Sequence, residues 1–194
     1  MPIWGENFIS MDGYFSSLGR FVNQFSDSES AVKFALAQAS GVSPKNARAV
    51  FSGFRADATI SSVRRIFEVS TVKLETYFDE ALSQLAMINT VRNDILHNGA
   101  LWAGEYMVVT NALHTIPRAA KTSRLVIEDL DDMTADLDVI GGRLRYYVAS
   151  STPSVPPEMV EMHRPSLQSP WRYKSLSPLK DQQAQGRAPR RSRS

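Results

Sequence analysis

The residues best suited to chemistry stand together as Arg92-Asn93-Asp94-Ile95-Leu96-His97, directly before Asn98-Gly99. Arg92 keeps its positive charge and can bind two phosphate oxygens at once. The imidazole of His97 can accept or donate a proton near neutral pH. Asn93, four residues before His97, shares a helix face with it and can orient the imidazole or hold a phosphate. A guanidinium, an amide and an imidazole at one helix end are suited to handling phosphate, whereas Asp94 is given no catalytic role.

These residues end an amphipathic helix that the sequence predicts from about Thr71 to Leu96. Apolar residues recur at three- and four-residue steps: Leu74, Phe78, Leu85, Ile88 and Ile95. At ~100° per residue, Arg92 falls about 20° from Leu85, in the middle of the apolar stripe. A charge there needs an anion, a partner or a wet interface. The alternative is that Arg92 bonds a carboxylate of a neighbouring helix and His97 caps its own helix.

Further helices are expected around this one, at about Met11–Ala39, Ser43–Phe51, Thr59–Val69 and Glu128–Val148. Ser26-Asp27-Ser28 could kink or break the first of them. Gly141-Gly142 in the last could allow a close helix approach. Strand-forming residues at Tyr106–Thr110 and Ser123–Ile127 predict a short hairpin. The expected fold is all-α, an up-and-down helical bundle with a short β-hairpin excursion.

Composition changes at Ser151, after which seven of the ten prolines lie. Residues 151–194 hold eight basic and three acidic residues, a net +5, and leave residues 1–150 at −3. The sequence therefore predicts one helical domain over 1–150 and a basic, Pro/Ser/Arg-rich disordered tail over 151–194. Such a tail could bind RNA or another polyanion, or simply keep the protein soluble.

Several classes of site are disfavoured. The chain has no cysteine, so disulfides and thiolate metal sites are excluded. His114 lies in an expected loop and His163 in the expected tail, with no metal-ligand pattern around them. The run Asp129 to Asp132 fits a helix-start charge cluster better than a magnesium site. No metal or cofactor is therefore expected. The absence of a signal peptide and of a membrane span predicts a cytoplasmic protein.

An Arg, a following polar residue and a His five positions after the Arg, at the end of a bundle helix, resemble the signature of the HEPN superfamily. Here these are Arg92, Asn93 and His97. A first helix that carries Phe25 and Glu29 and a closing amphipathic helix are similar too, so the resemblance covers about residues 10–150. Some toxin members carry a modifiable Tyr two residues after the His, where this chain has Gly99.

The resemblance implies a homodimer in which the two motif helices meet across a two-fold axis. It further implies a metal-independent endoribonuclease whose site takes Arg92, Asn93 and His97 from both copies, with RNA as substrate. A toxin or defence role, with an antitoxin or regulatory protein as partner, also follows from the resemblance alone. The alternative from the same family is a non-catalytic module that binds a nucleotide, RNA or a protein.

Overall fold

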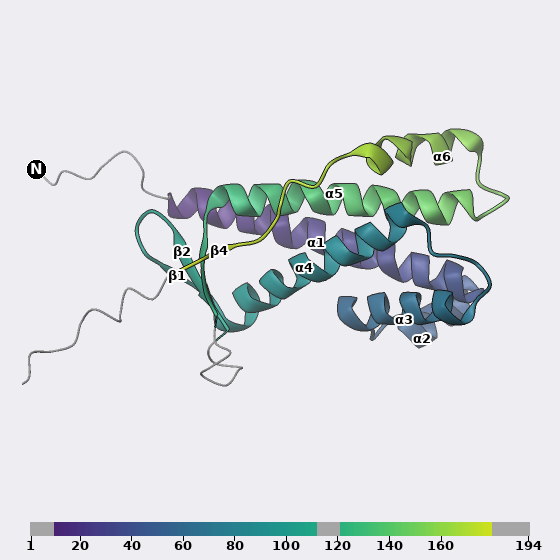
Figure 1. The fold of residues 1–194 in the computed structure, drawn as a ribbon, viewed down its shortest axis with the longest axis horizontal. Coiled ribbons are helices and arrows are strands. Elements are labelled where there is room, and N and C mark those ends of the chain that lie inside the picture. The colour runs from purple at the N-terminus through teal and green to yellow at the C-terminus, as the bar shows by residue number, and fades with distance from the viewer. Residues whose placement is uncertain (1–9, 112–120, 180–194) are drawn as a thin grey trace, which may run out of the picture.

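The computed structural model describes residues 10–111 and 121–179. Its helices are α1 (Met11–Ser40), α2 (Pro44–Phe51), α3 (Ala56–Val69), α4 (Thr76–Asn98), α5 (Ile127–Ser150), α6 (Pro157–His163) and the 3-10 helix η2 (Arg164–Gln168). Its strands are β1 (Ala100–Trp102), β2 (Met107–Thr110), β3 (Thr122–Leu125) and β4 (Ser177–Pro178). The expected helical bundle with a short β excursion is confirmed (Figure 1).

The long helices α1, α4 and α5 enclose the core. α1 and α5 run side by side, while α4 packs against α5 and α3 against α1 (Figure 1). The largest fully buried side chains of these three helices are Phe21, Leu36, Phe78, Leu82, Leu85, Ile88, Leu130, Met133, Leu137, Ile140 and Leu144. They follow the helical period, so burial of one apolar stripe per helix explains why these segments are helical.

α1 is continuous through Ser26-Asp27-Ser28, the segment that could have kinked or broken it. The hydroxyl of Ser26 donates to the carbonyl of Val22 in its own helix (3.0 Å), and that of Ser28 donates to Leu137 on α5 (2.9 Å). These bonds satisfy the two hydroxyls without breaking the backbone ladder. The helix ends at Gly41, whose positive φ of 65° suits glycine.

The predicted hairpin is present as the antiparallel pair β2 and β3, with the buried residues Met107 and Leu125 opposite each other. β1 and β4 extend it on either side to four strands in the order β1-β2-β3-β4. The sheet lies at the end of the bundle where α4 finishes and α5 begins (Figure 1). Most of the expected loop between the strands, with His114, falls in residues 112–120, outside the described residues.

The structure corrects the expectation of a disordered tail from Ser151. Residues 157–179, which we call the C-terminal strap, form α6, η2 and β4 and run back along the bundle to the sheet (Figure 1). Tyr173 is buried, and Trp171 and Leu176 pack against the core. The expected tail therefore starts no earlier than residue 180, and residues 180–194 lie outside the described residues.

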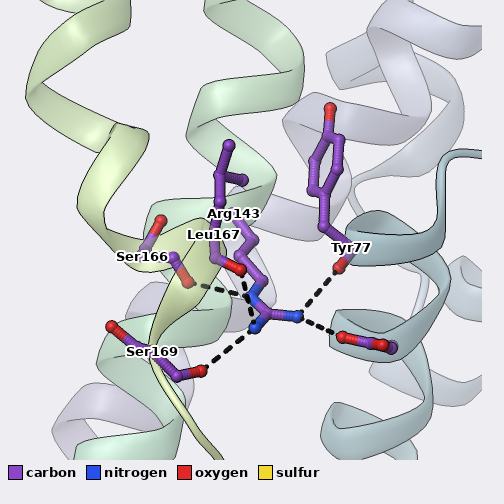
Figure 2. Close-up of polar contacts among 6 residues, drawn as sticks. Tyr77, Arg143, Ser166, Leu167 and Ser169 are labelled. Carbon is purple, nitrogen blue, oxygen red and sulfur yellow. Dashed lines mark hydrogen bonds and ion pairs between the residues drawn. The ribbon is translucent and has the colours of Figure 1, made fainter.

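The buried side chain of Arg143 on α5 ties the strap to the bundle. Its guanidinium donates to the carbonyls of Tyr77, Ser166, Leu167 and Ser169 (Figure 2). It also pairs with the Glu80 carboxylate at 2.7 Å. Its Cζ lies 4.3 Å from the centroid of the Trp171 ring. A Cβ added at the neighbouring Gly142 would lie 2.7 Å from the Cβ of Ser166. The absence of a Cβ at Gly142 therefore lets α5 and η2 approach closely, so the partner of this glycine is the 3-10 helix η2 rather than a long helix.

Candidate functional site

The last two turns of α4 carry the predicted site residues. The helix forms two residues beyond the expected end and stops at Gly99, whose positive φ of 73° and N–H bond to Ile95 (2.9 Å) end it. Val91 and Ile95 are buried and fix this end against the bundle, whereas His97 is exposed. Local sequence thus places an imidazole at the surface beside the sheet.

A shallow hollow of about 350 Å³ lies on this end of α4, lined by Asn93, Asp94, His97 and Asn98. The structure therefore brings together Asn93 and His97, as their four-residue spacing predicted. It also adds two residues that the sequence analysis did not include in the site. Asp94 contributes a carboxylate, and Asn98, the last residue of α4, contributes a side-chain amide.

Asn98 supplies an unused hydrogen-bond acceptor. Its Oδ1 is buried and has no hydrogen-bond partner within the part of the chain that the structure describes. A buried amide oxygen without a donor costs on the order of 1–3 kcal/mol. A ligand hydroxyl or amine, or a side chain of a second protein, could provide the missing donor. This unsatisfied acceptor could not be predicted from the sequence, because it depends on the burial of a single atom of Asn98.

Arg92 lies beside the hollow rather than in its lining. The side chain is half-buried, and its Nη1 donates to the Oδ1 of Asn93 at 3.0 Å. Its Cζ lies 5.2 Å from the centroid of the Phe25 ring on α1, a cation–π contact. Asn93 therefore links the two halves of the predicted site, since it holds Arg92 and lines the hollow with His97.

Arg92 makes no ion pair with any residue in the ranges 10–111 and 121–179. The alternative in which a carboxylate of a neighbouring helix neutralises it is thus not found among these residues. Nη1 is the only nitrogen of the guanidinium that bonds a described residue. The edge formed by Nε and Nη2 can therefore bind two oxygens of an anion, as arginine binds phosphate.

Other titratable groups have structural partners. The Asp129 carboxylate accepts a bond from the backbone N–H of Val126 (2.9 Å) at the start of α5, and burial raises the pKa of this carboxyl. Asp131 pairs with Arg20 on α1 at 3.0 Å. The interpretation of this acidic run as a helix-start cluster fits these contacts. Across the described ranges, no group of three or more His, Cys, Asp or Glu residues is placed to hold a metal ion.

No described helix is both long enough and apolar enough to cross a membrane. Comparison of the chain with protein-family models, curated proteins and solved structures gives no match.

Proposed function

We propose that this protein is a metal-independent endoribonuclease that acts as a homodimer, with Arg92, Asn93 and His97 of both copies at the site. One observation carries the proposal: Arg92 is half-buried and carries a charge that no described carboxylate neutralises, and the helix that carries it also presents the exposed imidazole of His97. The contact with Phe25 is worth about 0.5–2 kcal/mol. Neither that contact nor the Asn93 amide cancels the charge, so an anion is the natural missing partner.

RNA cleavage without a metal requires a base for the ribose 2′-OH and an acid for the leaving 5′-oxygen. Among the described residues, His97 is the one imidazole that lines the hollow, so a single chain offers one imidazole there. A two-fold dimer supplies the second imidazole and the second guanidinium. One His97 then takes the 2′-OH proton, the other protonates the 5′-oxygen, and both Arg92 side chains stabilise the charge on the phosphate oxygens. The products are a 2′,3′-cyclic phosphate and a 5′-hydroxyl.

Exposed apolar side chains near the hollow support a second copy as partner. Leu96 on α4 and Leu101 and Trp102 on β1 flank His97 in the chain and expose 45%, 67% and 55% of their surface. Apolar side chains exposed beside a polar hollow are typical of an interface. Asp94 adds a negative charge to the hollow, so an entering phosphate must be held mainly by Arg92 and by the protonated form of His97.

The decisive experiment is cleavage of a mixed RNA pool in excess chelator by the wild type and by His97→Ala, Arg92→Ala and Arg92→Lys. We expect losses of about 10²–10⁴-fold for His97→Ala and about 10²–10³-fold for Arg92→Ala. Lysine should not restore activity, because it lacks the edge that binds two oxygens. Arg172→Ala, a change at an exposed side chain of the strap, is the matched control and should cleave normally.

Cleavage that survives His97→Ala would contradict the proposal. So would a fall in melting temperature that accounts for the whole loss, because His97 would then serve only the helix end. RNA binding without cleavage, lost in Arg92→Ala, would instead support the non-catalytic module. One observation favours that second function: Arg92 does not line the hollow that His97 lines. A role in defence or as a toxin, with an antitoxin or regulatory partner, remains the setting that the HEPN resemblance favours.

The need for a second copy is tested with Leu96→Asp. Leu96 is exposed, so a carboxylate there should leave the isolated fold intact but weaken a dimer. We expect monomers by sedimentation, an unchanged circular dichroism spectrum and loss of cleavage. Val69→Asp, at a position 88% exposed on α3, is the control and should remain active. A monomeric Leu96→Asp protein with full activity would contradict the composite site.

The basic end of the chain is tested by deleting residues 180–194 alone, because residues 157–179 belong to the fold. This segment carries five basic residues and one acidic residue, a net +4. Binding to RNA is measured with the His97→Ala protein so that the RNA stays intact. If the segment binds RNA, its deletion should weaken binding and flatten the salt dependence by about 0.7 logarithmic units per lost phosphate contact. An unchanged slope would favour the solubilising role.

A further inference from the structure

A second pocket has a volume of about 460 Å³. The helix segments that line it lie at the end of the bundle away from the sheet (Figure 1). It is formed by the second half of α1, by α2 and by the end of α5. Its volume is in the range of small-molecule sites, about 300–1,000 Å³. Nothing in the proposed ribonuclease mechanism uses it.

The walls of this pocket are mainly apolar, and their apolar residues are Phe34, Ala37, Val42, Ala47, Phe51 and Val148. Phe34 is 63% exposed, whereas Phe21 and Phe25 of the same helix are buried in the core. An occupant with an apolar body would remove this ring and its neighbours from water.

The uncharged polar side chains of the pocket are largely committed to the fold. Ser30 donates to the carbonyl of Ser26 (3.0 Å), Gln38 to that of Ser151 (2.9 Å) and Thr152 to that of Val148 (2.7 Å). They are therefore poor candidates for orienting a ligand.

The two charged side chains in the lining, Lys33 and Arg48, are both cationic. Neither forms an ion pair within the described ranges, and no carboxylate belongs to the lining. An apolar cavity with two cations fits a ligand that has an apolar body and one anionic group. A second copy of the chain docked symmetrically on this pocket would bring the same positive charges face to face, which disfavours it.

We propose that this pocket binds a small amphiphilic carboxylate, with its chain against Phe34, Phe51 and Val148 and its head group between Lys33 and Arg48. The class of ligand is a single-chain organic acid. The site is independent of Arg92 and His97, so its test does not depend on the ribonuclease proposal.

The test is calorimetric titration of the full chain with decanoate, decanol and decyltrimethylammonium, which share one chain length and differ in charge. We expect decanoate to bind at least tenfold more tightly than decanol, and the cation not to bind. In Lys33→Ala/Arg48→Ala the decanoate affinity should fall about tenfold, the size expected for two solvent-accessible ion pairs. Lys45→Ala, an exposed cation on α2 outside the lining, should bind decanoate like the wild type.

A second variant tests the cavity itself. Ala37→Phe places a ring in the pocket and should abolish decanoate binding while the circular dichroism spectrum is kept. Equal binding of decanoate and decanol would overturn the proposal, as would equal losses in Lys45→Ala and in the double variant. Undiminished binding to Ala37→Phe would also overturn it. A wild-type dimer that Ala37→Phe dissociates, with no decanoate binding, would assign the pocket to a second copy instead.

Discussion

The C-terminal strap should depend on one buried carboxylate, that of Asp136 on α5. This side chain is fully buried and accepts three hydrogen bonds, two of them from the strap. Its Oδ2 accepts from Gln84 Nε2 (2.7 Å) and from the backbone N–H of Tyr173 (3.0 Å), and its Oδ1 accepts from the backbone N–H of Arg172 (2.9 Å). Gln84 closes the network by donating also to the carbonyl of Tyr173 at 2.9 Å. Asp136→Asn changes the hydrogen-bonding pattern and little else.

The cost of Asp136→Asn follows from these contacts. The amide oxygen can take the place of Oδ2 and keep two bonds, but the NH₂ group then faces the N–H of Arg172, donor against donor. One bond to a carboxylate, worth about 1.5–3 kcal/mol, is lost outright, and the other two weaken because the acceptor is neutral. Burying a neutral amide costs less than burying a charge, which offsets part of the loss. We expect a net destabilisation of about 2–4 kcal/mol, or a fall in Tm of roughly 5–15 °C.

Urea unfolding and amide hydrogen exchange measure this effect together. The amides of Arg172 and Tyr173 should lose protection more than those in the middle of α1, because the strap opens before the bundle does. The matched control is Asp138→Asn on the same helix, an exposed carboxylate that, among the described residues, accepts one long hydrogen bond, from Gln24 (3.5 Å). It should cost less than about 0.5 kcal/mol. If Asp136→Asn cost no more than the control and the strap amides kept their protection, this account of the strap would be refuted.

Three further predictions concern pH and close packing. Burial and the charge of Arg145 lower the pKa of His163 below 6.5, so the unfolded chain binds the proton first and the fold loses stability as pH falls below about 6.5. His163→Gln should reduce the difference between urea midpoints at pH 7 and pH 5. Burial raises the pKa of Tyr173 to about 12, so stability should fall as pH rises from 10 towards 12, where the unfolded tyrosine ionises first. Tyr173→Phe should reduce that fall in alkaline unfolding curves. Gly142→Ala should cost about 1–3 kcal/mol through its clash with η2, whereas Gly19→Ala, with open space around it, should stabilise α1 by about 0.5–1 kcal/mol in thermal melts.

The bundle could be predicted from the sequence because each long helix buries one periodic apolar stripe. The hairpin could be predicted too, since β2 and β3 consist of strand-forming residues whose alternation places Met107 and Leu125 inward. The strap could not be predicted from the sequence. Its few apolar anchors are spread among prolines and serines, and its hydrogen-bond partners Gln84, Asp136 and Arg143 are far away in the chain. The local composition of the strap does not reveal which residues of distant helices will form hydrogen bonds with it.

For the candidate site, too, one part could be predicted from the sequence and another part could not. Helical spacing alone predicted that Asn93 and His97 share a face and that Arg92 turns toward the bundle. The positions of the side chains around them depend on tertiary packing. The ring of Phe25 under Arg92 and the buried Oδ1 of Asn98 are examples, because each requires a neighbour that sequence spacing does not specify.

The environment of Arg92 depends both on helical spacing and on tertiary packing. Its place on the apolar stripe forces the side chain inward, and its permanent charge prevents it from being buried as the neighbouring residues are. Phe25 covers one face of the guanidinium and Asn93 holds Nη1, so the two contacts fix its orientation. An arginine restrained in this way loses less conformational entropy when it binds an anion than a mobile surface arginine does. The Nε and Nη2 edge that these contacts leave open is the one that matches two phosphate oxygens. Neighbours that orient a charge without neutralising it are what a phosphate site requires, whereas a purely structural arginine would be stabilised better by a carboxylate.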